Sequence, residues 1–193
     1  MPRIDNERFY TSAIELHGVS AKGVNWNSSD SQNLRFKIIL ELLPSNLDGF
    51  SLADAGCGFG DFYLYAKKEG RLPKKYIAID SIKEMVKITK ERTQTKAILA
   101  DICKDSLPSA SYYICSGAMN TLELFETHLF IQNCYASSEI GFIFNILYGS
   151  KKSQTYNYLT LGDIKIMASE IGVREVKFKK NYMKNDITVG FFK

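Results

Sequence analysis

Residues 52–61 read Leu-Ala-Asp-Ala-Gly-Cys-Gly-Phe-Gly-Asp, an apolar run followed by three glycines at alternate positions. Glycine permits the positive φ angles of a tight turn and lets a ligand approach the backbone closely. A helix that begins directly after such a turn offers free backbone N–H groups. We therefore predict, in this order, a strand, a ligand-binding turn and a helix.

From residue 50 onward, short apolar runs alternate with amphipathic stretches. The predicted strands are 51–55, 75–79, 96–100, 112–115 and 140–147, and the predicted helices are 61–69, 82–92, 121–137 and 161–171. This alternation is typical of βαβ units and a parallel sheet. Two more β-rich runs, 173–179 and 187–192, predict an antiparallel hairpin. We expect an α/β fold, a three-layer sandwich with a mixed sheet of seven strands.

The first 49 residues contain two helical patterns. The first covers 7–16, and the second follows an N-cap at Ser29 or Asp30 and ends at Pro44. We predict that residues 1–49 form a helical extension or lid and that residues 50–193 form the ligand-binding domain.

Composition limits the class of protein. The chain has 193 residues, about one domain, and 45% of them are hydrophobic, as in an ordinary globular protein. Its net charge of +4 is too small and too evenly spread to indicate a nucleic-acid partner. Its four cysteines form no CxxC pair and no metal-ligand cluster, so no metal is expected. Neither a signal peptide nor a membrane span is apparent, which predicts a cytoplasmic protein.

Acidic residues lie on both sides of the glycine turn. The spacing GxGxG differs from the GxGxxG of dinucleotide-binding proteins, and Asp54 and Asp61 would repel a pyrophosphate. A cationic ligand is therefore favoured. Asp80 ends the second predicted strand, 22 residues after Gly58, close to the offset of about 20 residues for an acid that binds a ribose. A simpler role for Asp80 is to cap the helix that follows.

The pattern acid-x-Gly-x-Gly-x-Gly resembles the first motif of class I S-adenosylmethionine-dependent methyltransferases. The resemblance implies their fold, S-adenosylmethionine as cofactor and S-adenosylhomocysteine as product. It also implies that Asp101 and Ile102, after the third strand, contact the adenine, unless Asp101 is only a surface residue. The expected cofactor-binding residues are Asp54, Gly56, Cys57, Gly58, Gly60, Asp61, Asp80, Ser81, Asp101, Ile102, Ser116 and Gly117.

A second resemblance concerns residues 16–36, which are similar to a subgroup of small bacterial methyltransferases with His-Gly, Trp and Gln-x-x-Arg-Phe. Here Trp26, Gln32 and Arg35 would belong to the lid or substrate site. Gln32 and Arg35 share one helix face, and Arg35 could bind the methionine carboxylate or an acidic substrate. The alternative is that Arg35 pairs with a local acid and that Trp26 fills the core.

The segment after the fourth strand bears on the acceptor. It lacks the proline-rich motif of enzymes that methylate exocyclic nitrogens, and Cys115 reads as a buried strand cysteine rather than a nucleophile. A nucleic-acid acceptor is therefore disfavoured. The candidate catalytic residues are His17 and Asn120, and catalysis by orientation alone would need neither.

We predict methyl transfer from S-adenosylmethionine to a small or medium-sized acceptor. The sequence leaves open a homodimer, another transferase with the same fold, and a non-catalytic cofactor-binding or partner subunit.

Overall fold

The computed structural model describes residues 5–20, 23 and 28–193. Its strands are β1 (Ser51–Ala55), β2 (Lys75–Asp80), β3 (Lys96–Leu99), β4 (Ala110–Ser116), β5 (Ser138–Leu147), β6 (Glu175–Lys179) and β7 (Asp186–Phe192). They form one seven-stranded sheet in the order β3-β2-β1-β4-β5-β7-β6. The first five strands are parallel, and β7 runs antiparallel between β5 and β6. The predicted mixed sheet is confirmed.

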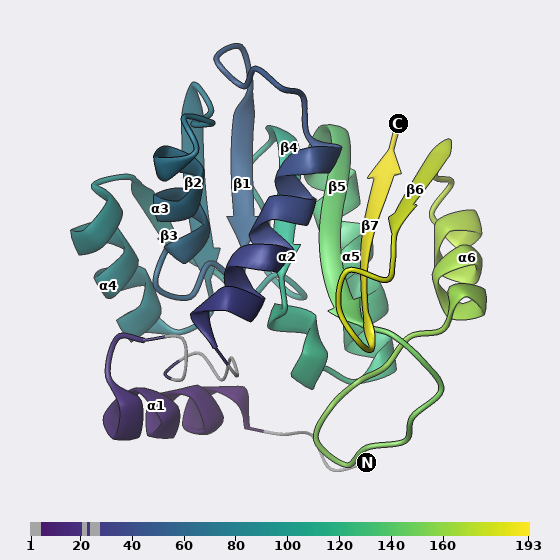
Figure 1. The fold of residues 1–193 in the computed structure, drawn as a ribbon, viewed down its shortest axis with the longest axis horizontal. Coiled ribbons are helices and arrows are strands. Elements are labelled where there is room, and N and C mark those ends of the chain that lie inside the picture. The colour runs from purple at the N-terminus through teal and green to yellow at the C-terminus, as the bar shows by residue number, and fades with distance from the viewer. Residues whose placement is uncertain (1–4, 21–22, 24–27) are drawn as a thin grey trace.

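Helices cover both faces of this sheet (Figure 1). They are α1 (Asn6–His17), α2 (Ser29–Leu42), α3 (Asp61–Lys68), α4 (Lys83–Thr93), α5 (Leu124–Ser137) and α6 (Leu161–Glu170), with a short 3-10 helix η2 (Ala118–Thr121). One hydrophobic core joins α2 and α3 to the sheet, and the other joins α5 and α6 to its opposite face. This arrangement is a three-layer sandwich.

Strand β1 shows how the sequence produces two cores. Leu52 belongs to the core beneath α2 and α3, whereas Ala53 and Ala55 belong to the core beneath α5 and α6. Successive side chains of a strand point to opposite faces, so a strand covered on both sides needs apolar residues throughout. The exception on β1 is Asp54, which is 2% exposed. A buried carboxyl group in this position requires a partner.

Most predicted helix ends agree with the structure to within one or two residues, and two of the differences have a clear cause. The N-cap of α2 is Ser28, whose side chain accepts from the backbone N–H of Ser31, rather than Ser29 or Asp30. The helix predicted over 121–137 begins later, as α5 at Leu124, because a capping box at Glu123 and Glu126 starts it there, and Thr121 instead ends η2.

Within residues 1–49 the two helices have different surroundings. Helix α2 contributes Phe36, Ile39 and Leu40 to the core on its side of the sheet and is therefore part of a layer of the sandwich. Helix α1 lies near the edge where the parallel strands end (Figure 1). Of the two, only α1 has the location expected of a lid.

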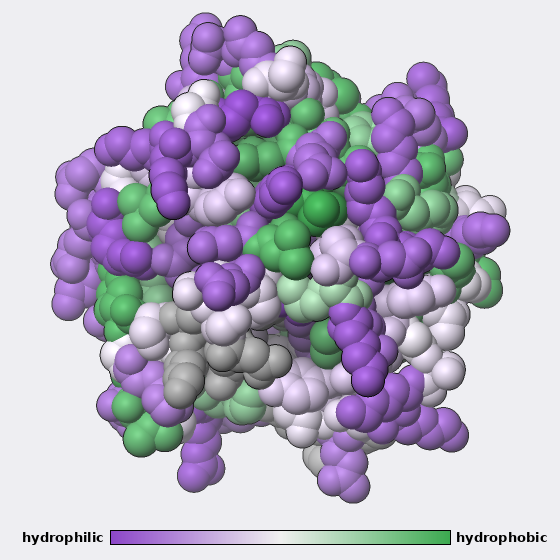
Figure 2. Space-filling model, viewed as in Figure 1, coloured by the Kyte–Doolittle hydropathy of each residue, from purple (hydrophilic) through white to green (hydrophobic). Residues whose placement is uncertain are grey.

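The face shown in Figure 2 is mostly hydrophilic, with apolar side chains in small groups. None of the helices in the described part of the chain combines the length and apolar character needed to cross a bilayer.

Candidate functional site

The glycine-rich turn connects β1 to α3. Gly56 has a φ of +76°, and a Cβ atom placed there would lie 2.3 Å from the Cβ of Ala118. The N–H groups of Gly56 and Cys57 donate to the carbonyl oxygen of Ile79 at 2.8 and 3.0 Å. These bonds attach the turn to the end of β2. Position 56 therefore needs glycine both for its conformation and for the close approach of the chain.

Gly60 has a different role from that expected. It is the N-cap of α3 with a φ of +76°, and a Cβ atom there would lie 2.7 Å from Thr93 Cγ2 and 3.1 Å from Thr89 Cγ2. Although the sequence predicts Gly60 as a cofactor contact, it does not line the cavity described below. Its missing side chain instead allows α4 to pack against the turn.

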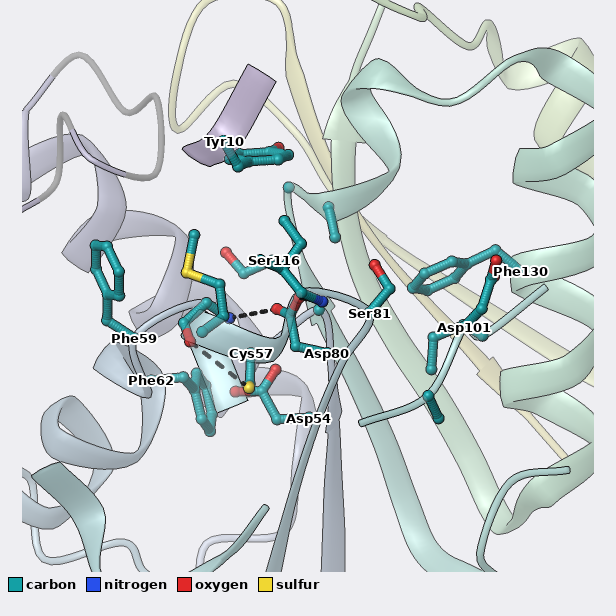
Figure 3. Close-up of a pocket in the computed structure, with 18 of the residues that line it drawn as sticks. Tyr10, Asp54, Cys57, Phe59, Phe62, Asp80, Ser81, Asp101, Ser116 and Phe130 are labelled. Atoms are coloured by element: carbon teal, nitrogen blue, oxygen red, sulfur yellow. Dashed lines mark hydrogen bonds between the residues drawn. The ribbon is translucent and has the colours of Figure 1, made fainter. Parts of the chain in front are cut away.

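Asp80 closes β2 and faces the turn (Figure 3). Its Oδ2 accepts from the N–H of Gly58 at 2.9 Å, and its Oδ1 accepts from the N–H of Ile82 at 3.0 Å. Burial raises the pKa of Asp80 to about 6, and the backbone hydrogen bonds limit this rise. Asp80 thus both caps the chain before α4 and carries negative charge at the turn above about pH 6.

Asp54 lies beneath the same turn (Figure 3). The hydroxyl of Tyr76 donates to its Oδ2. Burial raises the pKa of Asp54 to about 7, the bond from Tyr76 opposes this rise, and the charges of Asp80 and Asp61 add to it. Asp54 and Asp80 therefore both change charge close to neutral pH.

A cavity of about 800 Å³ opens beside these residues at the carboxyl ends of the parallel strands. Its size lies within the range of roughly 300–1,000 Å³ typical of ligand pockets. Eleven of the twelve residues predicted to bind a cofactor line it, namely Asp54, Gly56, Cys57, Gly58, Asp61, Asp80, Ser81, Asp101, Ile102, Ser116 and Gly117. The fold therefore brings together segments that are up to 63 positions apart in the sequence, from Asp54 to Gly117.

Asp101 stands at the far end of the cavity from Phe59, near Phe130 (Figure 3). Its Oδ1 accepts from the N–H of Cys103 at 2.9 Å, and its Oδ2 pairs with Lys104 at 2.6 Å. Ile102 beside it is 5% exposed. Both oxygens of this carboxylate therefore interact with groups of its own loop.

Several cavity-lining residues are not anticipated by the sequence analysis. They are largely apolar or aromatic and include Tyr10, Phe36, Phe59, Phe62, Ile82, Met85, Leu122 and Phe130. Tyr10 comes from α1 and lies over the cavity (Figure 3). Together with Ile14, one helical turn later, it packs on a small core of Phe59, Ile82 and Met85. The spacing of Tyr10 and Ile14, four positions apart, could have indicated that α1 has a buried face, but it could not have indicated that this face covers the cavity.

Tyr10 carries no charge at neutral pH. Burial raises its pKa to about 12, and the charge of Asp80 contributes. The hydroxyl can therefore donate or accept a hydrogen bond, but the phenolate that a general base would require is not populated near neutral pH.

The two described residues of the three assigned to the lid or substrate site, Gln32 and Arg35, have different surroundings. Gln32 lines the cavity. Arg35 does not: its Nε donates to Asp186 Oδ2 at 2.7 Å, its Nη2 bonds to the same oxygen, and both side chains are buried. Of the two roles left open for Arg35, this pairing supports an acid of the protein, Asp186 of β7, rather than a carboxylate of a ligand, although the acid is not local in the sequence. Trp26 lies outside the described residues.

Neither candidate catalytic residue lines the cavity. His17 is exposed at the end of α1. The side-chain oxygen of Asn120 accepts from the N–H of Leu147 at 3.1 Å, so this amide helps to hold the loop after β5. Cys115 is fully buried in β4, and burial raises the pKa of its thiol, as expected for a strand cysteine. Among the described residues, no group of three or more His, Cys, Asp or Glu side chains is arranged to hold a metal.

Comparisons with known proteins agree with this geometry. Residues 53–136 match the family model described as methyltransferase domain. No curated protein matches the sequence. A putative methyltransferase of Haloferax volcanii, solved in complex with the Trm112 methyltransferase activator, is similar over 96% of this chain and 97% of its own, with a TM-score of 0.72 and 14% identity.

Two other similar structures contain cofactor. Magnesium protoporphyrin IX methyltransferase from Synechocystis PCC 6803, with bound S-adenosylhomocysteine, is similar over 84% of this chain and 83% of its own (TM-score 0.69, 13% identity). Human N-acetylserotonin methyltransferase, in complex with S-adenosylmethionine, is similar over 96% of this chain and 55% of its own (TM-score 0.63, 17% identity). These likenesses show the fold.

Proposed function

We propose that this chain, which has the class I methyltransferase fold and matches the methyltransferase domain model over residues 53–136, transfers a methyl group from S-adenosylmethionine to a small or medium-sized acceptor. The observation that carries the proposal is the position of Asp80. Its carboxyl group ends β2, bonds to the N–H of Gly58 in the glycine turn, and lines the cavity. The remaining lining residues fit the same cofactor.

The charges of the cavity wall favour a cationic ligand. Six aspartates line it, and none of the lysines, arginines or histidines in the described ranges does. Their side chains can bind hydroxyl, amine and sulfonium groups but would repel a phosphate. When bound, S-adenosylmethionine would supply a methyl group activated by a positively charged sulfur. We assign the ribose hydroxyls to Asp80, the adenine to Asp101 and Ile102, and the methionine part to the turn at 56–58 beside Asp54.

Catalysis would rest on orientation. Transfer of a methyl group is an in-line displacement, and holding the reacting atoms in line can supply much of the rate acceleration. Ser116 and Gly117 present the end of β4 to the cavity, and Tyr10 covers it as a neutral phenol. His17 and Asn120 lie outside the lining, so we assign no dedicated base.

Acceptor selection would fall to the N-terminal part of the chain. The predicted division into a lid, residues 1–49, and a cofactor domain, residues 50–193, is retained as a proposal with one refinement. Helix α1 rests on the body through the small core containing Phe59 and Met85, whereas α2 is part of the sandwich. Movement of α1 would then admit ligands to the cavity.

A second reading is a non-catalytic cofactor-binding or partner subunit. It is favoured by the absence of both catalytic candidates from the cavity lining. One similar structure is a putative methyltransferase in complex with a methyltransferase activator, so a protein of this fold can bind a partner subunit.

Calorimetry followed by turnover separates these functions. We expect heat on titration with S-adenosylhomocysteine, and release of S-adenosylhomocysteine when S-adenosylmethionine is supplied with a library of small acceptors and cell extract. No heat with either cofactor form would refute the proposal. Heat without turnover, with and without added extract, would favour the subunit reading.

A further inference from the structure

One polar side chain of the cavity wall has no role in the function proposed above. Gln32 lies in the second turn of α2, is 7% exposed and lines the cavity. A long amide side chain is seldom buried without hydrogen-bond partners. Its position between two helices and an open cavity therefore makes its orientation informative.

The neighbours of Gln32 determine that orientation. Its Nε2 lies 3.3 Å from Asp61 Oδ2 at the start of α3. A carboxylate oxygen only accepts hydrogen bonds, so the NH₂ group must face Asp61 and the carbonyl Oε1 must point elsewhere. An amide in which O and N were exchanged would place two acceptors against each other.

Asp61 is itself held in place from α4. Arg92 Nη1 donates to Asp61 Oδ1 at 2.8 Å and to the carbonyl oxygen of Phe59 at 2.7 Å. This guanidinium fixes the carboxylate relative to the glycine turn, and the carboxylate in turn fixes Gln32. Three helices thus contribute to a rigid hydrogen-bonded chain that ends at the cavity, with Gln32 as its last member.

The surroundings of Gln32 indicate what the free oxygen can bind. A carbonyl oxygen accepts hydrogen bonds, and the cavity wall in the described ranges supplies aspartates but no cationic side chain. The aromatic rings of Phe36, Phe59 and Phe62 line the same cavity, and ring faces attract cations. A carboxylate would be repelled here, whereas an N–H donor would be bound.

We propose that Gln32 Oε1, oriented by Asp61 and Arg92, is the hydrogen-bond acceptor for an amine or ammonium group in the cavity. This inference rests on the proposed function, which supplies two sources of such a group. One is the α-amine of the cofactor's methionine part, and the other is an amine on the methyl acceptor. In either case Gln32 is a specificity-determining residue.

The test compares Gln32→Met with the wild-type protein. Methionine keeps the length of the side chain and removes both amide atoms. Calorimetry uses two probes, S-adenosylhomocysteine and 5′-methylthioadenosine, which shares the nucleoside but lacks the amine. A ratio of the two affinities is insensitive to a general loss of folded protein. Gln132→Met, at an exposed position of α5, is the matched control.

If the cofactor supplies the amine, Gln32→Met weakens the binding of S-adenosylhomocysteine at least fivefold and leaves the affinity for 5′-methylthioadenosine unchanged. If the acceptor is the source, both nucleosides bind as before, and binding of tyramine, tryptamine or putrescine to the cofactor-loaded protein weakens at least fivefold. Equal behaviour of Gln32→Met and wild type with every probe overturns the inference but not the proposed function. Failure of wild type to bind either nucleoside overturns both.

Discussion

Replacing Asp80 with asparagine tests the proposed cofactor site at its central residue. Asparagine keeps the shape of the side chain and one acceptor oxygen but removes the charge. Both carboxylate oxygens of Asp80 already accept from backbone N–H groups, at 2.9 and 3.0 Å, and have further lone pairs for the ribose hydroxyls. Because asparagine keeps only one acceptor oxygen, the substitution removes one of these two backbone hydrogen bonds as well as the charge that strengthens the bonds to the ligand.

The magnitude follows from the strength of charge-assisted hydrogen bonds. A bond to a charged group contributes about 1.5–3 kcal/mol, roughly twice a neutral bond. Two such bonds reduced to neutral ones lose about 1.5–3 kcal/mol, which weakens binding of S-adenosylhomocysteine about 10- to 100-fold. Isothermal titration calorimetry at pH 8, where Asp80 is ionised, measures this difference. Asp48→Asn, at an exposed position, is the control and should bind as wild type.

A second pH provides an internal check. Burial raises the pKa of Asp80 to about 6, so at pH 5 most of the wild-type carboxyl group is protonated and resembles asparagine. The difference between wild type and Asp80→Asn should then shrink. The reasoning is refuted if the two proteins differ less than threefold at pH 8, or if their difference is the same at both pH values.

Three other predictions concern stability. Asp54 has a pKa of about 7 in the folded state, above its value in the unfolded chain, so protonation of Asp54 stabilises the fold. The melting temperature of the ligand-free protein should therefore fall between pH 5 and pH 8. It should fall less in Asp54→Asn, which cannot ionise at this position. Arg35→Met leaves Asp186 buried without its cation and should cost about 3–5 kcal/mol in urea unfolding, whereas a loss under 1 kcal/mol would contradict the buried ion pair. Gly60→Ala should lower the free energy of unfolding by about 2–4 kcal/mol, because the new side chain strains the backbone and overpacks against α4. The control Gly49→Ala, where a Cβ atom meets open space, should lower it by less than about 1 kcal/mol in the same assay.

The parts of the fold that the sequence predicts well are those with local signals. Strand β1, the glycine turn and the start of α3 follow one another within about 15 residues, and each has a residue-type requirement that can be recognised in isolation. The position of Asp80 is also local, since it ends the next strand of the same βαβ unit. The order of the strands in the sheet is not predicted by these local signals. The hairpin predicts that β6 and β7 pair with each other but not that β7 lies next to β5.

Arg35 shows where local patterns are insufficient. The spacing of α2 correctly placed its guanidinium toward the interior, where it is 7% exposed. Its partner Asp186 is 151 positions away, and nothing in the sequence of α2 distinguishes a buried acid of the protein from an acid of a ligand. Gly60 presents the same ambiguity, because a nearby ligand and the nearby methyl groups of Thr89 and Thr93 would each require a residue without a side chain.

The cavity residues that the sequence predicts and those that it misses come from different elements of the fold. Residues assigned to the cofactor come from strand ends, whose positions are set by the sheet and hence by short-range patterns. The other wall of the cavity is assembled from α1, α2 and the start of α3 through Tyr10, Gln32 and Phe62, which meet only by tertiary packing. Substitutions on this second wall leave unchanged the residues that we assign to the ribose and the adenine. Selectivity for the acceptor should therefore change with Tyr10 and Gln32 before it changes with the residues at the strand ends.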